Sequence, residues 1–262
     1  MGKITEALKK AAEERLSRIE KLDQQQEVKY QFVARKKVDS KFDPRVVVFH
    51  EPDSTVAEQY RIIRTNIQAI KSKTPIKAIT ITSALHREGK TITAINLAIS
   101  MAYDLGKKNI LLVDADLRRA RISKYLGINS EIGLSDLISD GVNLDDTLLN
   151  IGIYNLTFLP AGKSVRNPAE LLSSLKMKHL IGLLKSKYEY IIFDAPPVMN
   201  LTDAGVLGAQ TDGVIMVIQA GRTQRGIVSH AESLLKQAQA KLLGYVLTNI
   251  QYHIPAYIYR YL

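Results

Sequence analysis

The chain has 262 residues, a hydrophobic share of 46% and a formal net charge of +10. This length can hold one α/β domain with appendages, and the apolar content is sufficient for a packed core. The sequence contains no cysteine, which excludes disulfides and thiolate metal sites and is compatible with a reducing cytosol. No run of about 18 apolar residues occurs, so we expect no membrane-spanning helix.

The positive charge is spread along the chain, with a short cluster at Arg35, Lys36 and Lys37. Such an excess of positive charge can favour binding to nucleic acid, to an anionic membrane surface or to an acidic protein partner. Neither a zinc-finger spacing nor an RNA-binding aromatic motif accompanies it, so nucleic-acid binding is the weaker interpretation.

The first 25 residues carry apolar side chains every three or four positions, which predicts an amphipathic helix. Its stripe consists of Ile4, Leu8, Ala12, Leu16, Ile19 and Leu22. A polar, weakly periodic stretch follows up to about Pro44 and is typical of a linker. We therefore divide the chain into an N-terminal helix and linker (1–45), a compact domain (46–251) and a tyrosine-rich C-terminal tail (252–262). The helix either docks on a partner or membrane surface or packs on its own domain, and both remain open.

Strands alternate with helices inside the compact domain. Thr55-Val-Ala-Glu58 has the form of a capping box, and a helical face follows it. Further helices are expected over 92–101, 171–184 and 227–238. Strands are expected over 79–81, 109–113, 155–159, 190–193, 213–219 and 244–248. This alternation predicts an α/β fold with a mostly parallel sheet and helices on both faces.

The most informative segment runs from Ala84 to Thr91 and fits the phosphate-loop pattern Ala-x-x-x-x-Gly-Lys-Thr between a strand and a helix. In such a loop, backbone N–H groups and the helix N-terminus face polyphosphate. We expect Lys90 to reach the β- and γ-phosphates of ATP, and the Thr91 hydroxyl to hold Mg²⁺. The alternative is a tight turn with a solvated lysine. The expected nucleotide contacts are Ala84, His86, Arg87, Glu88, Gly89, Lys90, Thr91 and Ile92.

Two further strands end in carboxylates. Asp114 and Asp116 follow one apolar strand, and Asp194 ends another. Side chains at the carboxyl ends of parallel strands project over the crevice where ligands bind, so all three acids are expected beside Lys90. A single aspartate of this kind is more often a turn or cap residue. Three of them beside a phosphate loop indicate a magnesium–nucleotide site.

These motifs, in this order, resemble those of the bacterial tyrosine kinases that accompany exopolysaccharide assembly. The resemblance covers roughly residues 50–262. It includes Asp114-Ala-Asp116-Leu-Arg118, Asp194-Ala-Pro-Pro197, the segments 159–163, 167–172 and 202–204, and the tyrosine-rich tail. Glu58-Gln-Tyr-Arg61-Ile-Ile-Arg64 matches the family's ExxRxxR assembly motif. The chain has His86-Arg87 where the family usually has Pro-Gly.

The resemblance implies a P-loop NTPase (MinD-like) architecture and an ATP-dependent protein-tyrosine autokinase. It implies that Lys90 neutralises phosphate charge, and that Asp114 accepts or steers the proton of the attacking tyrosine. The implied metal shell is Thr91, Asp116 and Asp194, around Mg²⁺. The implied phosphoacceptors are Tyr252, Tyr257, Tyr259 and Tyr261, modified in trans within a homo-oligomeric ring whose interface contains Glu58, Arg61 and Arg64.

The same resemblance implies further partners, namely a membrane-embedded activator of polysaccharide assembly and a phosphotyrosine phosphatase. It implies a cytoplasmic chain that is held peripherally at the inner face of the cell membrane through such a partner.

Two other functions remain open. A partitioning or cell-division ATPase of the MinD/ParA type shares the fold and uses water as its acceptor. Those ATPases have a signature lysine where this chain has Leu85, which favours the kinase. The third interpretation is a catalytically inactive nucleotide-binding scaffold, and His86-Arg87 is the feature that supports it.

Overall fold

The computed structural model describes residues 36–37, 41–103, 108–153 and 155–250. Its strands are β1 (Lys36–Lys37), β2 (Ala78–Ser83), β3 (Ile110–Asp114), β4 (Leu149–Asn150), β5 (Leu156–Leu159), β6 (Tyr190–Asp194), β7 (Gly213–Gln219) and β8 (Leu242–Thr248). Its helices are α2 (Val47–His50), α3 (Thr55–Lys71), α4 (Lys90–Ala102), α5 (Ile122–Leu126), α6 (Leu134–Ser139), α7 (Leu144–Thr147), α8 (Pro168–Ser173), α9 (Leu175–Lys187), α10 (Asp203–Gln210) and α11 (Arg225–Gln237). Within the described ranges, no helix has the length and apolar character needed to span a bilayer.

The strands form one sheet in the order β1-β4-β5-β3-β6-β2-β7-β8, and every neighbouring pair is parallel except β4 with β5. The central strands β2, β3 and β6 are buried along their whole length, as expected for β-branched, apolar strands covered on both faces. The register pairs Asp194 with Asp114 on one side and with Ile81 on the other. The acidic strand ends therefore lie at the same sheet edge as the phosphate loop.

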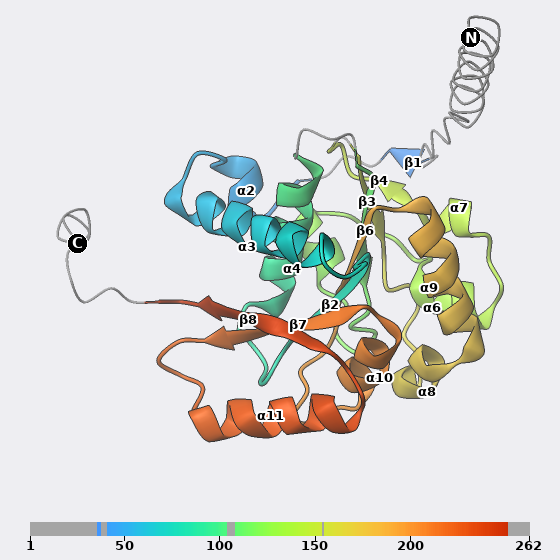
Figure 1. The fold of residues 1–262 in the computed structure, drawn as a ribbon. Helices are drawn as coiled ribbons and strands as arrows, with labels where there is room; N and C mark the ends of the chain where they lie inside the picture. Colours follow the sequence, from blue (N-terminus) through green and yellow to red (C-terminus); the bar gives the residue numbers. More distant parts are fainter. Residues whose placement is uncertain (1–35, 38–40, 104–107, 154, 251–262) are drawn as a thin grey trace, which may run out of the picture. The chain divides into compact units, whose positions relative to one another are not determined.

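Helices cover both faces of the sheet (Figure 1). Helix α4 follows β2 and packs against β2, β3 and β6, and α3 packs against α4. Because connections between parallel strands are right-handed, α9, α10 and α11 lie on the opposite face. Nearly every residue of α4 is buried, so this helix forms the centre of the core. The predicted α/β architecture, with a mostly parallel sheet, is confirmed.

Two local predictions are wrong. Helix α3 is capped by Ser54 rather than Thr55, because Ser54 is extended and its Oγ accepts the Ala57 N–H at 3.1 Å. The single helix predicted over 171–184 is two helices, α8 and α9. They separate at Ser174, which is extended (ψ 153°) and whose Oγ accepts the Met177 N–H at 3.1 Å. A serine at an N-cap can interrupt an apolar period that continues on both sides.

The packed region extends further toward the N-terminus than residue 46, because the side chain of Phe42 belongs to the buried core. The remaining division of the chain stays a prediction. The apolar stripe from Ile4 to Leu22 and the tyrosine-rich tail both lie outside the described residues.

Candidate nucleotide site

The phosphate loop connects the end of β2 to the start of α4, as the sequence predicts. Two of its residues adopt left-handed backbone angles, Arg87 with φ 64° and Gly89 with φ 93°. Glycine adopts this region without steric cost, whereas an arginine does so only when its surroundings hold it there. Arg87 therefore occupies a position whose backbone angles suit glycine, the residue that the family described above usually has there.

Lys90 begins α4 and points back over the sheet edge. Its Nζ lies 2.8 Å from Asp116 Oδ2 and 3.2 Å from Asp194 Oδ1, and the side chain is almost entirely buried. Burial disfavours the ammonium charge, but Asp194 and Asp116 outweigh that effect and raise the pKa of Lys90. The Thr91 Oγ1 lies 3.4 Å from the same Nζ. The structure thus brings together the lysine, the threonine and two of the acids that the sequence singles out.

Asp114 lies deeper, without any exposed surface. Its Oδ1 accepts the Asp116 N–H at 3.3 Å, and its Oδ2 accepts the Ile122 N–H at 3.0 Å. Burial, together with the charge of Asp194 beside it, raises the pKa of Asp114 to about 8. Burial also raises the pKa of Asp194.

The acidic cluster fits an Mg²⁺ ion. It offers oxygen donors, and the Oδ2 of Asp194 is buried with no hydrogen-bond partner among the described residues. Across those residues, no three His, Asp or Glu side chains are arranged as a complete metal site. Magnesium commonly takes one or two carboxylates and completes its shell with phosphate oxygens and water. Asp116, Asp194 and the Thr91 hydroxyl could hold it in that way.

A pocket opens directly in front of the phosphate loop, and it is rich in positive charge. Among the described residues that line it, Asp116 is the one acid, and the cationic side chains are those of Arg87, Lys90, Arg119 and Arg121. His86, Gly89, Thr91, Ile92 and Tyr125 complete the lining. Clustered cations around backbone N–H groups are suited to a polyphosphate.

Three of these lining residues, Arg119, Arg121 and Tyr125, were not predicted from the sequence. The signal was present, because the loop after the second acidic motif must cross the same sheet edge as Asp116. Two expected contacts do not line the pocket: Ala84 and Glu88 are both buried. Partial burial, with the charge of Arg119 nearby, lowers the pKa of His86 and favours its neutral form.

A bidentate ion pair joins two sequence motifs that are far apart in the chain. The Arg118 Nε lies 2.9 Å from Asp203 Oδ2, and Arg118 Nη2 lies 3.2 Å from Asp203 Oδ1. Asp203 is fully buried at the first turn of α10, where the helix dipole also favours its charge. This contact fixes the segment that follows Asp116.

Comparison with known proteins places the chain in a family. Residues 76–242 match the family model described as AAA domain. Tyrosine-protein kinase YwqD of Bacillus subtilis is 37% identical over 213 residues, covering 81% of this chain and 89% of that protein. The chain belongs to the bacterial tyrosine-protein kinases. The kinase domain of Escherichia coli tyrosine kinase ETK superimposes with a TM-score of 0.77 at 27% identity, covering 84% of this chain and 86% of that structure.

The likeness to MinD lies in the fold alone. The septum site-determining protein MinD of Pyrococcus horikoshii, in complex with Mg-ADP, gives a TM-score of 0.56 at 24% identity, over 70% of this chain and 75% of that structure. The P-loop NTPase architecture is thereby confirmed for this tyrosine-kinase family member.

The predicted assembly residues of this kinase-family chain lie on α3 and make contacts within the chain. Arg61 Nη1 lies 2.6 Å from Glu58 Oε2, and Arg61 Nη2 donates to the Pro52 carbonyl at 2.6 Å. Arg64 Nη1 donates to the Ser100 carbonyl near the end of α4 at 2.7 Å. Glu58 and Arg61 keep much of their surface exposed. A role in assembly stays a prediction, and so do the four tail tyrosines as phosphoacceptors.

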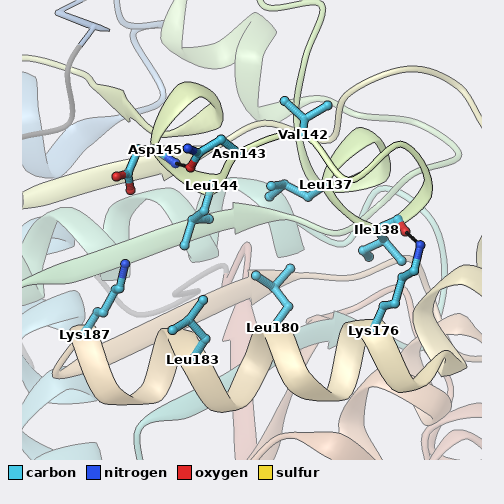
Figure 2. Close-up of a pocket in the computed structure, with 10 residues that line it drawn as sticks. All are labelled: Leu137, Ile138, Val142, Asn143, Leu144, Asp145, Lys176, Leu180, Leu183 and Lys187. Carbon is cyan, nitrogen blue, oxygen red and sulfur yellow. Dashed lines mark hydrogen bonds between the residues drawn. The ribbon is translucent and has the colours of Figure 1, made fainter.

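A second pocket, of about 390 Å³, lies between α6, α7 and α9, away from the phosphate loop (Figure 2). Its walls are mainly aliphatic, and its Lys176 Nζ donates to the Ile138 carbonyl at 2.9 Å. It contains none of the motif residues of the tyrosine-protein kinases. The larger pocket is not assigned to the nucleotide, because the phosphate loop, three arginines and Asp116 all line the smaller one.

Proposed function

We propose that this chain is an ATP-dependent protein-tyrosine autokinase, and that its activity regulates exopolysaccharide synthesis or export. The observation that carries the proposal is Lys90 held between Asp116 and Asp194 at the end of a phosphate loop, in a member of the bacterial tyrosine-protein kinases. Tyr252, Tyr257, Tyr259 and Tyr261 are the proposed phosphoacceptors, and one subunit's tail is delivered to the site of the next.

The residues of the site divide the work of phosphoryl transfer. Lys90 and the pocket arginines bind and neutralise the phosphates, which is the main catalytic requirement of this chemistry. Bound Mg²⁺ would supply further charge neutralisation from a shell containing Thr91, Asp116 and Asp194. Asp114 is assigned to hold the proton of the attacking phenol, whose own pKa is about 10. Because its pKa is about 8, Asp114 is mostly protonated at pH 7, and its ionised form, which becomes more populated as the pH rises toward 8, is the one that accepts the proton.

The proposal includes three partners. Identical subunits form a ring through the exposed Glu58–Arg61 surface of α3. A membrane-embedded protein of the polysaccharide machinery recruits and activates the chain at the inner face of the cell membrane. A phosphatase removes the phosphate from the tyrosines. The chain is accordingly placed in the cytoplasm, with peripheral attachment to the membrane. The family membership and the net positive charge support this arrangement.

The decisive experiment is incubation of the full chain with labelled ATP, with and without Mg²⁺, alone and with membranes from its source cells. Phosphotyrosine is followed by blotting and phosphate release by a coupled assay. We expect Mg²⁺-dependent phosphotyrosine with little free phosphate. Phosphate release without phosphotyrosine would instead identify a MinD/ParA-type ATPase. Nucleotide binding with neither product would identify an inactive scaffold.

A further inference from the structure

Glu88 is a buried carboxylate within the phosphate loop, with 1% of its surface exposed. Its Oε2 accepts the Leu85 N–H at 2.5 Å. Its Oε1 accepts the Gln219 N–H at 3.3 Å and a hydrogen bond from the Thr223 hydroxyl. Its main-chain oxygen accepts from Thr248 Oγ1 at 2.7 Å. The side chain therefore faces the end of β7, away from the pocket, and the main-chain oxygen contacts the end of β8.

The position of Glu88 in the loop indicates what these hydrogen bonds do. It lies between the two left-handed residues, Arg87 and Gly89. An arginine with left-handed backbone angles relaxes to another conformation unless surrounding contacts hold the backbone in place. Hydrogen bonds to a carboxylate are among the stronger ones, and here they reach both within the loop and across to the end of β7 and Thr223. The Arg222 Nη1 adds a contact to the Arg87 carbonyl at 3.3 Å.

We propose that Glu88 is a positioning residue, whose carboxylate holds the phosphate loop in its nucleotide-binding conformation by fastening it to the end of β7 and to Thr223. The inference rests on the proposed function, because it requires that this loop binds ATP. Glu88 does not touch the nucleotide through its side chain. Its loss lets the loop N–H groups and Lys90 sample other orientations, so ATP binding weakens before the chemical step changes.

The test uses Glu88→Gln, because glutamine has the same shape but presents an NH₂ group. Whichever way its amide turns, a donor then faces the N–H of Leu85 or of Gln219. Thr223→Val is a milder variant that removes the hydroxyl bond to Oε1 and keeps the side-chain shape. It serves if Glu88→Gln does not fold.

Asp136 provides a matched control far from the loop. It is also a buried carboxylate, and its Oδ2 accepts the N–H groups of Gly133 at 2.9 Å and Lys163 at 3.2 Å and a hydroxyl from Ser135 at 3.5 Å. All three of these bonds go to one oxygen, which an asparagine carbonyl could replace, so the control is Asp136→Ala, which removes the bonds without touching the phosphate site. Melting temperature, the Kd for Mg-ADP by calorimetry, and KM and kcat for ATP are measured for each variant.

We expect Glu88→Gln to raise Kd and KM by about tenfold or more, the effect of losing one well-placed interaction, while kcat at saturating ATP stays within about threefold. Thr223→Val should raise both constants less. Asp136→Ala should lower the melting temperature and leave KM unchanged. Unchanged binding in Glu88→Gln, or an equal rise of KM in Asp136→Ala, would overturn the inference. If the unaltered chain bound no Mg-ADP, the proposed function itself would fail instead.

Discussion

Replacing Lys90 with methionine separates the two tasks that the structure gives this side chain. Methionine is about as long as lysine but carries no charge. In the chain without nucleotide, it leaves Asp116 and Asp194 without the ammonium that lies 2.8 and 3.2 Å away. In the presence of ATP, it removes the cation that is expected to reach the phosphates. Lys90→Met should therefore lower the stability of the free protein and also abolish phosphotyrosine formation.

The expected loss of stability follows from burial. Removing one partner of a buried ion pair costs about 3–5 kcal/mol, because the other charge stays buried. Protonation of one carboxylate offers partial relief. From an ordinary pKa of 3.8, neutralising it at pH 7 costs about 4 kcal/mol at 1.36 kcal/mol for each pKa unit. The two routes are similar in cost, so we expect about 3–4 kcal/mol, which lowers the melting temperature by about 10 °C in a domain of this size.

Thermal denaturation with EDTA and with Mg²⁺ measures the effect. The variant has more uncompensated negative charge than the original chain, so Mg²⁺ should raise its melting temperature further than it raises that of the original. Lys185→Met is the matched control, because Lys185 pairs with Asp212 at 2.7 Å in a more exposed setting. That pair should contribute about 1 kcal/mol or less. An unchanged melting temperature in EDTA would contradict the buried ion pair, and a near-normal phosphotyrosine signal would contradict the role of Lys90.

Three further changes test the loop, the α3 surface and the tail. Arg87→Gly relieves the backbone strain at φ 64°, so the free energy of unfolding should stay equal or rise by up to about 1 kcal/mol. The same change removes one cation from the pocket, so calorimetry should show several-fold weaker Mg-ATP binding, and tighter binding would contradict this prediction. Arg61→Ala removes an exposed ion pair that contributes only about 0.3–0.5 kcal/mol to stability, so the subunit should stay folded. We expect light scattering to show monomer mass because the interface is lost, and an unchanged oligomer would refute the assembly proposal. Arg64 is less suitable because it donates to the Ser100 carbonyl. Replacing all four tail tyrosines with phenylalanine should remove most phosphotyrosine and preserve ATP binding. Mass spectrometry that finds the phosphate chiefly on Tyr60, Tyr103 or Tyr188 would contradict this prediction.

The sequence predicted the sheet and the meeting of Lys90 with the acids for a simple reason. Buried parallel strands are nearly continuous apolar runs, and all of them end at one edge. Asp114, Asp116 and Asp194 could therefore be placed together without knowledge of the strand order. The register that sets Asp114 against Asp194 was not accessible, because it depends on which strands become neighbours.

Side-chain directions in loops were beyond the sequence, because a loop has no period that relates position to burial. Glu88 was expected among the loop residues that contact the nucleotide, and the inward turn of its side chain to the Leu85 and Gln219 N–H groups was not foreseen. The pairing of Arg118 with Asp203 joins residues 85 positions apart and becomes evident only when α10 is seen beside the second acidic motif. Ser174 was missed because its capping bond competes with an apolar pattern that fits one continuous helix.

The charges of the free site explain how nucleotide binding can proceed with little rearrangement. Lys90 is already buried and charged, and its partners are the two carboxylates proposed as metal ligands. When Mg-ATP enters, Lys90 would exchange those carboxylates for phosphate oxygens, and the carboxylates would exchange Lys90 for Mg²⁺. Each buried charge keeps an opposite charge throughout, so the desolvation cost is met in the folded chain before the ligand arrives. The exchange requires a loop that stays in place while its partners change, and the contacts of Glu88 are suited to holding it.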